Sequence, residues 1–140
     1  GGLMRLVVTS GEPAGIGPDL CVALAARDFP FALAVAADPG LLRERARLLG
    51  RDLALRTWSA AEASRPHRAG GLAVVGHPLA RPATPGRLDP GNARYVLGML
   101  DAAADGCLRG EFDAMVTAPV QKSVIADAGI CLTTVRNRKS

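Results

Sequence analysis

The sequence predicts an α/β fold, in which a layered, mainly parallel sheet is packed against helices. Short apolar runs that do not alternate with polar residues recur along the chain, which is typical of strands buried on both faces. Segments with apolar residues at helical spacing separate these runs. Strand and helix alternate about five times, as expected for a parallel sheet.

Five segments are expected to form strands. The first, Met4–Thr9 (MRLVVT), is short and rich in β-branched residues. Two segments are expected to form loops: Ser59–Gly71 is polar and contains Pro66, and His77–Gly86 holds three prolines, which exclude a helix and a central strand. The other expected strands are Phe31–Ala36, Leu53–Thr57, Leu72–Val75 and Ala114–Thr117.

Four helices are expected, and proline or glycine marks most of their ends. The second begins at Asp38-Pro39 and stops at Gly50, with Leu41, Leu42, Arg45, Leu48 and Leu49 helically spaced between them. The others run from Pro18 to about Arg27, from Asp89-Pro90 to Gly110, and from Val120 to Ala128 before Gly129.

The charge pattern excludes a nucleic-acid face. The chain has 140 residues, which is one modest domain or a piece of a larger one, and a formal net charge of +4. Residues 131–140 hold three basic residues and no acidic one, so most of the excess charge lies in a tail. Aromatic residues make up only 4% of the chain, too few for a base-stacking platform.

Other patterns bear on compartment and metal binding. No apolar stretch approaches the roughly 20 residues that span a bilayer, and no secretory leader is visible. Cys21, Cys107 and Cys131 are widely separated, so we interpret the first two as small buried residues and expect a reducing, cytoplasmic location. His67 and His77 have no partner at a metal-ligand spacing, so both are expected at the surface and no metal ligand is identified.

Two turns follow predicted strands at the sheet edge where α/β proteins bind ligands. In Ser10–Gly17 (SGEPAGIG), Gly15 and Gly17 allow close approach of a ligand, and the helix that follows offers free N–H groups to an anion. The turn matches neither nucleotide-binding glycine motif, and Asp19 would repel an anion. A tight strand-to-helix connection without ligand is the alternative.

Three polar side chains in these turns are candidates for a cleft. Glu12, held extended by Pro13, could bond a substrate amine or hydroxyl or pair with Lys122. Thr117 and Lys122 together suit an anionic substrate. The alternatives are a solvated carboxylate, a capping threonine and a surface lysine.

Four motifs, in order and at matching spacing, resemble the 4-hydroxythreonine-4-phosphate dehydrogenase family from about Met4 to Ile130. They are SGEPAGIGPD at residues 10–19, DGCLRG at 105–110 followed by Phe112, TAPVQK at 117–122, and DAGI at 127–130. The residues that match these motifs, and are therefore expected to line the substrate cleft, are Glu12, Gly15, Gly17, Thr117, Pro119 and Lys122.

The resemblance implies a cytoplasmic, homodimeric enzyme of vitamin B6 synthesis that oxidises 4-phosphooxy-L-threonine with NAD or NADP. It implies a divalent metal, commonly zinc, and a fold of two α/β subdomains like that of isocitrate and isopropylmalate dehydrogenases. The metal would polarise the alcohol oxygen, and the nicotinamide would accept the hydride.

The resemblance ends after residue 130. Members of the family continue to a Gly-His-Thr motif and later metal-binding histidines, and neither occurs here. We therefore interpret residues 4–130 as the N-terminal part of the dehydrogenase fold, 131–140 as a divergent basic tail from a truncated or frameshifted gene, and 1–3 as a cloning remnant. No catalytic residue is identified, and neither cofactor is expected to bind these 140 residues strongly.

Several readings of function remain at this point. The chain is a part of the dehydrogenase, or of a paralogue acting on another phosphorylated hydroxy acid. By itself it is an inactive, non-catalytic fragment. A generic phosphate-binding module rests on the glycine-rich turn alone.

Overall fold

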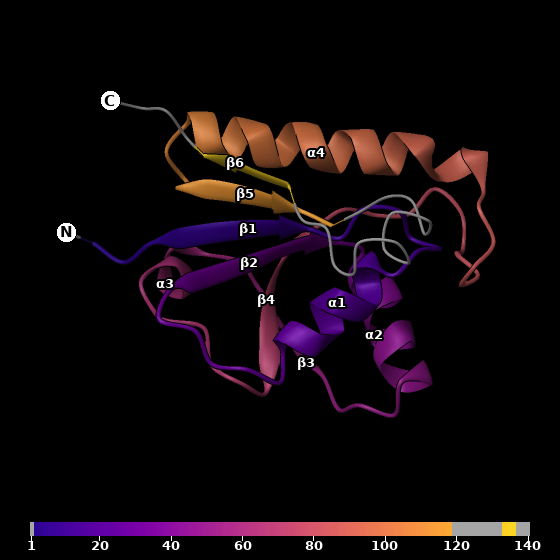
Figure 1. Cartoon of the computed structure of the whole chain (residues 1–140), viewed down its shortest axis with the longest axis horizontal. Coiled ribbons are helices and arrows are strands. Elements are labelled where there is room, and N and C mark those ends of the chain that lie inside the picture. Colours follow the sequence, from indigo (N-terminus) through magenta and orange to yellow (C-terminus); the bar gives the residue numbers. More distant parts are fainter. Residues whose placement is uncertain (1, 119–132, 137–140) are drawn as a thin grey trace.

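The computed structural model describes residues 2–118 and 133–136. A sheet lies at its centre, with strand order β3-β4-β2-β1-β5-β6 (Figure 1). The first five strands are parallel, and β6 pairs antiparallel with β5. The prediction of a mainly parallel sheet is confirmed. The strands are β1 (Arg5–Thr9), β2 (Ala32–Ala37), β3 (Ala54–Thr57), β4 (Gly71–Gly76), β5 (Ala114–Thr117) and β6 (Thr133–Arg136).

Helices cover both faces of the sheet (Figure 1). On one face lie α1 (Gly17–Leu24) and α2 (Pro39–Leu48), which contact each other. The other face is covered by the long helix α4 (Ala93–Leu108), which follows a 3-10 turn, η1 (Pro90–Asn92). Asp38 caps α2 as expected, because its Oδ1 accepts a hydrogen bond of 3.0 Å from the Leu41 N–H.

Each face of the sheet has its own apolar core. Beneath α4, residues of β1 and β2 pack against Tyr95, Met99 and Phe112. On the opposite face Leu42 of α2 and Leu72 of β4 are fully buried in a core that also includes Cys21 and Val22 of α1. The central strand β2 therefore lies between two layers, and all six of its residues are buried, whereas the edge strand β3 is mostly exposed.

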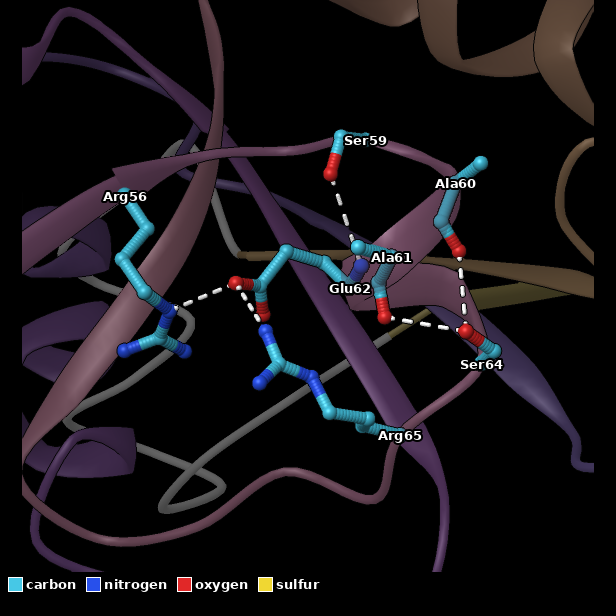
Figure 2. A network of polar contacts seen from close by, with 7 residues as sticks. All are labelled: Arg56, Ser59, Ala60, Ala61, Glu62, Ser64 and Arg65. Atoms are coloured by element: carbon cyan, nitrogen blue, oxygen red, sulfur yellow. Dashed lines mark hydrogen bonds and ion pairs between the residues drawn. The ribbon is translucent and has the colours of Figure 1, made fainter.

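The prediction of a loop over Ser59–Gly71 is wrong at both ends. Residues Ala60–Ala63 form a one-turn helix, α3, and Gly71 begins β4. The Ser59 hydroxyl accepts a long hydrogen bond of 3.5 Å from the Glu62 N–H, so Ser59 and Glu62 have the spacing of a helix start. Figure 2 shows the Glu62 carboxylate between Arg56 and Arg65, at 2.8 Å from a nitrogen of each. These local bonds stabilise the turn before Pro66 and the glycines end it.

Residues 133–136 form β6, where no element was expected. Its pairing partner is β5, in the register Ala114–Arg136 to Thr117–Thr133. The helix predicted over Val120–Ala128 lies outside the described residues, as does Cys131. No helix within the described part of the chain is long and apolar enough to cross a membrane.

The two described cysteines are buried thiols, as predicted. Burial raises the pKa of Cys21 to about 12. The pKa of Cys107 is also raised, mainly by burial and to a smaller extent by the charge of Asp113.

We expect iodoacetamide at pH 8 to leave Cys21 unmodified in the folded protein and to modify it fully in guanidinium. Peptide mass spectrometry measures both states. Rapid labelling of Cys21 without denaturant would contradict its burial.

Candidate functional site

The candidate site lies at the carboxyl end of β1, between β2 and β5. The chain leaves β1 for α1 on one face of the sheet, whereas α4, which precedes β5, covers the other face (Figure 1). Such a reversal of direction in a parallel sheet opens a crevice where α/β proteins bind ligands. Thr9 and Thr117 end the two strands in register. The Ala118 N–H donates to the Thr9 carbonyl at 3.1 Å, so the two predicted turns start side by side.

The first turn, residues 10–17, is closed by a contact between its ends. A Cβ atom added to Gly17 would lie 1.8 Å from the Ser10 carbonyl oxygen and 3.1 Å from Ala118 Cβ. Only glycine fits there, because side-chain carbons do not approach other atoms so closely. At Gly15 the same addition would lie 3.3 Å from the Glu12 oxygen, a contact that a small shift relieves. Gly17 thus packs against both turns, and Gly15 has more freedom.

Glu12 is half-buried at the tip of the turn. Its backbone carbonyl accepts a 3.0 Å bond from the Gly15 N–H, and its Oε1 accepts a long 3.5 Å bond from the Ala14 N–H. Thr117 is half-buried at the end of β5. Pro119 and Lys122 lie outside the described residues, so pairing of Glu12 with Lys122 stays a prediction.

Arg45 contacts the turn at residues 10–17. The sequence pattern predicted only that it is helically spaced with the leucines of α2. Arg45 on α2 is 4% exposed, and its guanidinium donates to the carbonyls of Pro13 and Gly15, each at 2.8 Å. It also forms an ion pair of 2.7 Å with Asp19. The repulsion of anions expected from Asp19 is therefore compensated by a positive charge. The available signal was the position of Arg45 among Leu41, Leu42 and Ala46, on the buried side of α2.

A polar cluster lies under the start of the turn. The hydroxyls of Ser10 and Tyr95 share a 3.4 Å hydrogen bond, and the Tyr95 oxygen accepts a 2.9 Å bond from the Asp38 N–H. Burial is the main cause that raises the pKa of Tyr95, so its hydroxyl stays protonated at neutral pH. The Thr9 hydroxyl is buried and has no hydrogen-bond partner within the described residues. This cluster connects β1, α2 and α4 directly behind the turn.

The proline-containing segment 77–92 also contacts the glycine-rich turn at residues 10–17. It has no helix before η1 and only an isolated bridge between Thr84 and Arg87, which confirms the prediction for His77–Gly86. Buried Asn92 bonds both backbone groups of Arg81, at 3.1 and 3.2 Å. The Gly86 N–H donates to the Ala14 carbonyl at 2.8 Å, so the segment is fixed against the glycine-rich turn.

The expectation of two surface histidines is wrong for His67, which is 4% exposed. Its Nε2 donates to the Leu24 carbonyl at 2.8 Å, because the backbone of His67 pairs with Phe29 and Phe31 and brings the ring against the end of α1. His77 is partly buried, and desolvation lowers its pKa. In the described part of the chain, no three His, Cys, Asp or Glu side chains come together to hold a metal ion.

Comparisons with known proteins find one family. Residues 30–135 match the family model described as pyridoxal phosphate biosynthetic protein PdxA. The chain is 52% identical over 126 residues to a 4-hydroxythreonine-4-phosphate dehydrogenase of Serratia proteamaculans, covering 90% of this chain and 38% of that protein. It is 53% identical over 129 residues to the enzyme so named of Methylococcus capsulatus, covering 92% and 39%.

Solved structures show the same fold. A 4-hydroxythreonine-4-phosphate dehydrogenase from Burkholderia phymatum superposes with a TM-score of 0.74 at 21% identity, covering 92% of this chain and 40% of that one. The enzyme so named from Klebsiella pneumoniae gives 0.69 at 25% identity, covering 91% and 40%. The chain thus spans about 40% of the length of the relatives that it matches.

Proposed function

The chain belongs to the family of the pyridoxal phosphate biosynthetic protein PdxA, and from this premise we propose that it forms part of the substrate cleft of a 4-hydroxythreonine-4-phosphate dehydrogenase. The observation that carries the proposal is 52% identity over 126 residues to a relative of that name. The family resemblance seen in the sequence motifs is thereby confirmed, and the α/β fold expected from it agrees with the solved relatives. The substrate in the proposal is 4-phosphooxy-L-threonine.

In this proposal the two turns at the end of β1 and β5 bind the substrate. It carries a cationic amine, a hydroxyl and an anionic phosphate. The Glu12 carboxylate suits the amine or the hydroxyl as a charged acceptor. The Thr117 hydroxyl and the Lys122 ammonium suit the anionic groups. Gly15, Gly17 and Pro119 shape the backbone around them.

The proposed reaction also needs a nicotinamide cofactor and a metal ion, because no side chain accepts a hydride. The proposed cofactors are NAD or NADP, which accepts the hydride, and a divalent metal, zinc, which stabilises charge on the substrate oxygen. The described residues do not fit a metal site, because no three ligating side chains come together among them. The proposal therefore places the metal ligands in the part of the relatives that this chain does not span. It also places the enzyme in the cytoplasm as a homodimer.

Two narrower alternatives remain within this proposal. A paralogue of the dehydrogenase would act on another phosphorylated hydroxy acid through the same two turns. The 140 residues by themselves are proposed to be inactive, since they span about 40% of the relatives' length.

Glu12 provides the test of the proposed cleft. The protein for this test is a hybrid dehydrogenase in which residues 4–130 of this chain replace the matching segment of the Serratia proteamaculans enzyme. We expect Glu12→Ala to lower kcat/KM for 4-phosphooxy-L-threonine by at least about tenfold, because a charged hydrogen bond to substrate is lost. Production of reduced nicotinamide measures the rate.

The matched control is Glu44→Gln, because Glu44 is an exposed carboxylate on α2 that pairs with Arg47. It should leave kcat/KM within about twofold of the unmodified hybrid. Unchanged kinetics in Glu12→Ala would remove Glu12 from the site. Turnover of a different phosphorylated hydroxy acid in preference to 4-phosphooxy-L-threonine would favour the paralogue.

A further inference from the structure

We propose that Arg45 is a positioning residue, which fixes the conformation of residues 13–15 and through them the place of the Glu12 carboxylate. The proposal rests on the proposed function, in which Glu12 contacts the substrate. Among the described residues, the hydrogen bonds of the Arg45 guanidinium go to the carbonyls of Pro13 and Gly15 and to Asp19, and none goes to the Glu12 side chain. Arg45 acts from behind the turn, from helix α2.

The first argument is the burial of a charged side chain with specific acceptors. Arg45 is 4% exposed, and its two terminal nitrogens donate to the Gly15 and Pro13 carbonyls at 2.8 Å. Arginine is rarely buried unless its charge and donors are paired. The planar guanidinium reaches two carbonyls at once, which a lysine ammonium does not match. These contacts join residues about 30 positions apart in the sequence.

The second argument is the position that the arginine occupies. Its neighbours on the same side of α2 are Leu42 and Ala46, which pack into an apolar core with Cys21 and Val22 of α1. An apolar side chain at position 45 would be desolvated at lower cost than a guanidinium. The arginine therefore contributes specificity of conformation at this position rather than hydrophobic burial.

The third argument is how the contacts reach Glu12. In a trans peptide the C=O and the next N–H point in opposite directions, so holding the Pro13 carbonyl also orients the Ala14 N–H. That N–H donates to Glu12 Oε1 at 3.5 Å. Next to it, the Gly15 N–H donates to the Glu12 carbonyl at 3.0 Å. Arg45 thus directly holds the Pro13–Ala14 peptide group, whose N–H contacts the Glu12 carboxylate. It also holds the Gly15 carbonyl, so the peptide group whose N–H bonds the Glu12 carbonyl lies between two peptide groups fixed by Arg45.

The charges agree with this arrangement. The third acceptor of Arg45 is the Asp19 carboxylate, at 2.7 Å, and it is one-third exposed. The pair of Arg45 and Asp19 has no net charge. The charge that the described turn presents to a ligand is therefore that of Glu12, which suits a cationic or hydrogen-bond-donating group of the substrate.

The test is a double-mutant cycle between Arg45 and Glu12 in the hybrid dehydrogenase. Arg45→Met should lower kcat/KM at least about tenfold when Glu12 is present, and less than about threefold when Glu12 is already alanine. Arg45→Lys, which keeps the charge but contacts one carbonyl, should fall between Arg45→Met and the unmodified hybrid. The matched control is Arg43→Met, an exposed arginine on the same helix, which should change kcat/KM by less than about twofold.

Backbone amide hydrogen exchange supplies a measurement that does not depend on catalysis. In Arg45→Met the amides of Ala14 and Gly15 should exchange at least about tenfold faster, while Val35 in β2 exchanges as before. Equal loss of kcat/KM in both Glu12 backgrounds, or unchanged exchange of the two turn amides, overturns the proposal. If Arg45→Met does not fold, Arg45→Lys decides through the same cycle and the same amides.

Failure of the proposed function gives a different result. Unchanged kinetics in Glu12→Ala would show that Glu12 does not contact the substrate. Exchange at Ala14 and Gly15 would still report whether Arg45 holds the turn. Loss of rate in Glu12→Ala together with no coupling to Arg45 would leave the function intact and overturn the positioning role.

Discussion

Replacing Gly17 with alanine is expected to lower the free energy of unfolding by at least about 3 kcal/mol, enough to leave a marginal domain unfolded. The added Cβ would lie 1.8 Å from the Ser10 carbonyl oxygen, and the nearest atoms are backbone rather than a flexible side chain. Relief requires moving the end of β1 or the start of α1. Chemical denaturation followed by circular dichroism measures the change.

Gly98→Ala is the matched control for this substitution. Gly98 lies inside α4, is exposed, and has no atom within 4 Å of an added Cβ. Alanine there should stabilise the chain by about 0.5–1 kcal/mol, because it lowers the backbone entropy that the helix costs. A Gly17→Ala protein that is as stable as the unmodified chain would show that Gly17 does not pack against Ser10.

Leu42→Ala is expected to lower the free energy of unfolding by about 2–5 kcal/mol. Leu42 has no exposed surface and packs in the core between α2, α1 and the sheet. Truncation removes apolar contacts and leaves a cavity that the neighbouring strands cannot fill. The measurement is again the midpoint and slope of a denaturation curve.

Leu97→Ala serves as the control, because the same side chain is 61% exposed on α4. Its stability should stay within about 0.5 kcal/mol of the unmodified chain. An equal loss of unfolding free energy in Leu42→Ala and Leu97→Ala would show that Leu42 is not buried in the core beneath α2.

Local signals predicted most elements of this fold. The continuous apolar run of β2 and the Asp38-Pro39 start of α2 depend on a few neighbouring residues, and both elements begin within one residue of the expected place. The short helix α3 was missed because Pro66 and the glycines outweighed the Ser59–Glu62 spacing. Strand β6 depends on its pairing with β5, which no pattern inside residues 131–140 reveals.

The candidate site was predicted less completely than the fold. Glu12, Gly15 and Gly17 are candidates because one short motif contains them, and Thr117 is a candidate because it ends an apolar run. Arg45 was not identified as a site residue, since its acceptors lie about 30 residues earlier in the chain. The role of a buried charged residue depends on the groups that pack around it in three dimensions. Helical periodicity in the sequence indicates only which face of the helix the residue occupies.

The pairing of β1 with β5 has a consequence for the order of events during synthesis. Arg5 N–H donates to Asp113 at 2.7 Å, a contact that spans 108 positions in the sequence. One edge of β1 therefore remains unpaired on the ribosome until β5 has left the exit tunnel, while β1 and β2 are already available to each other. Closing so long a loop is slow compared with forming the helices. The nascent chain thus exposes one unpaired edge of β1 until β5 emerges, and such an edge is a binding site for chaperones that pair with exposed strands.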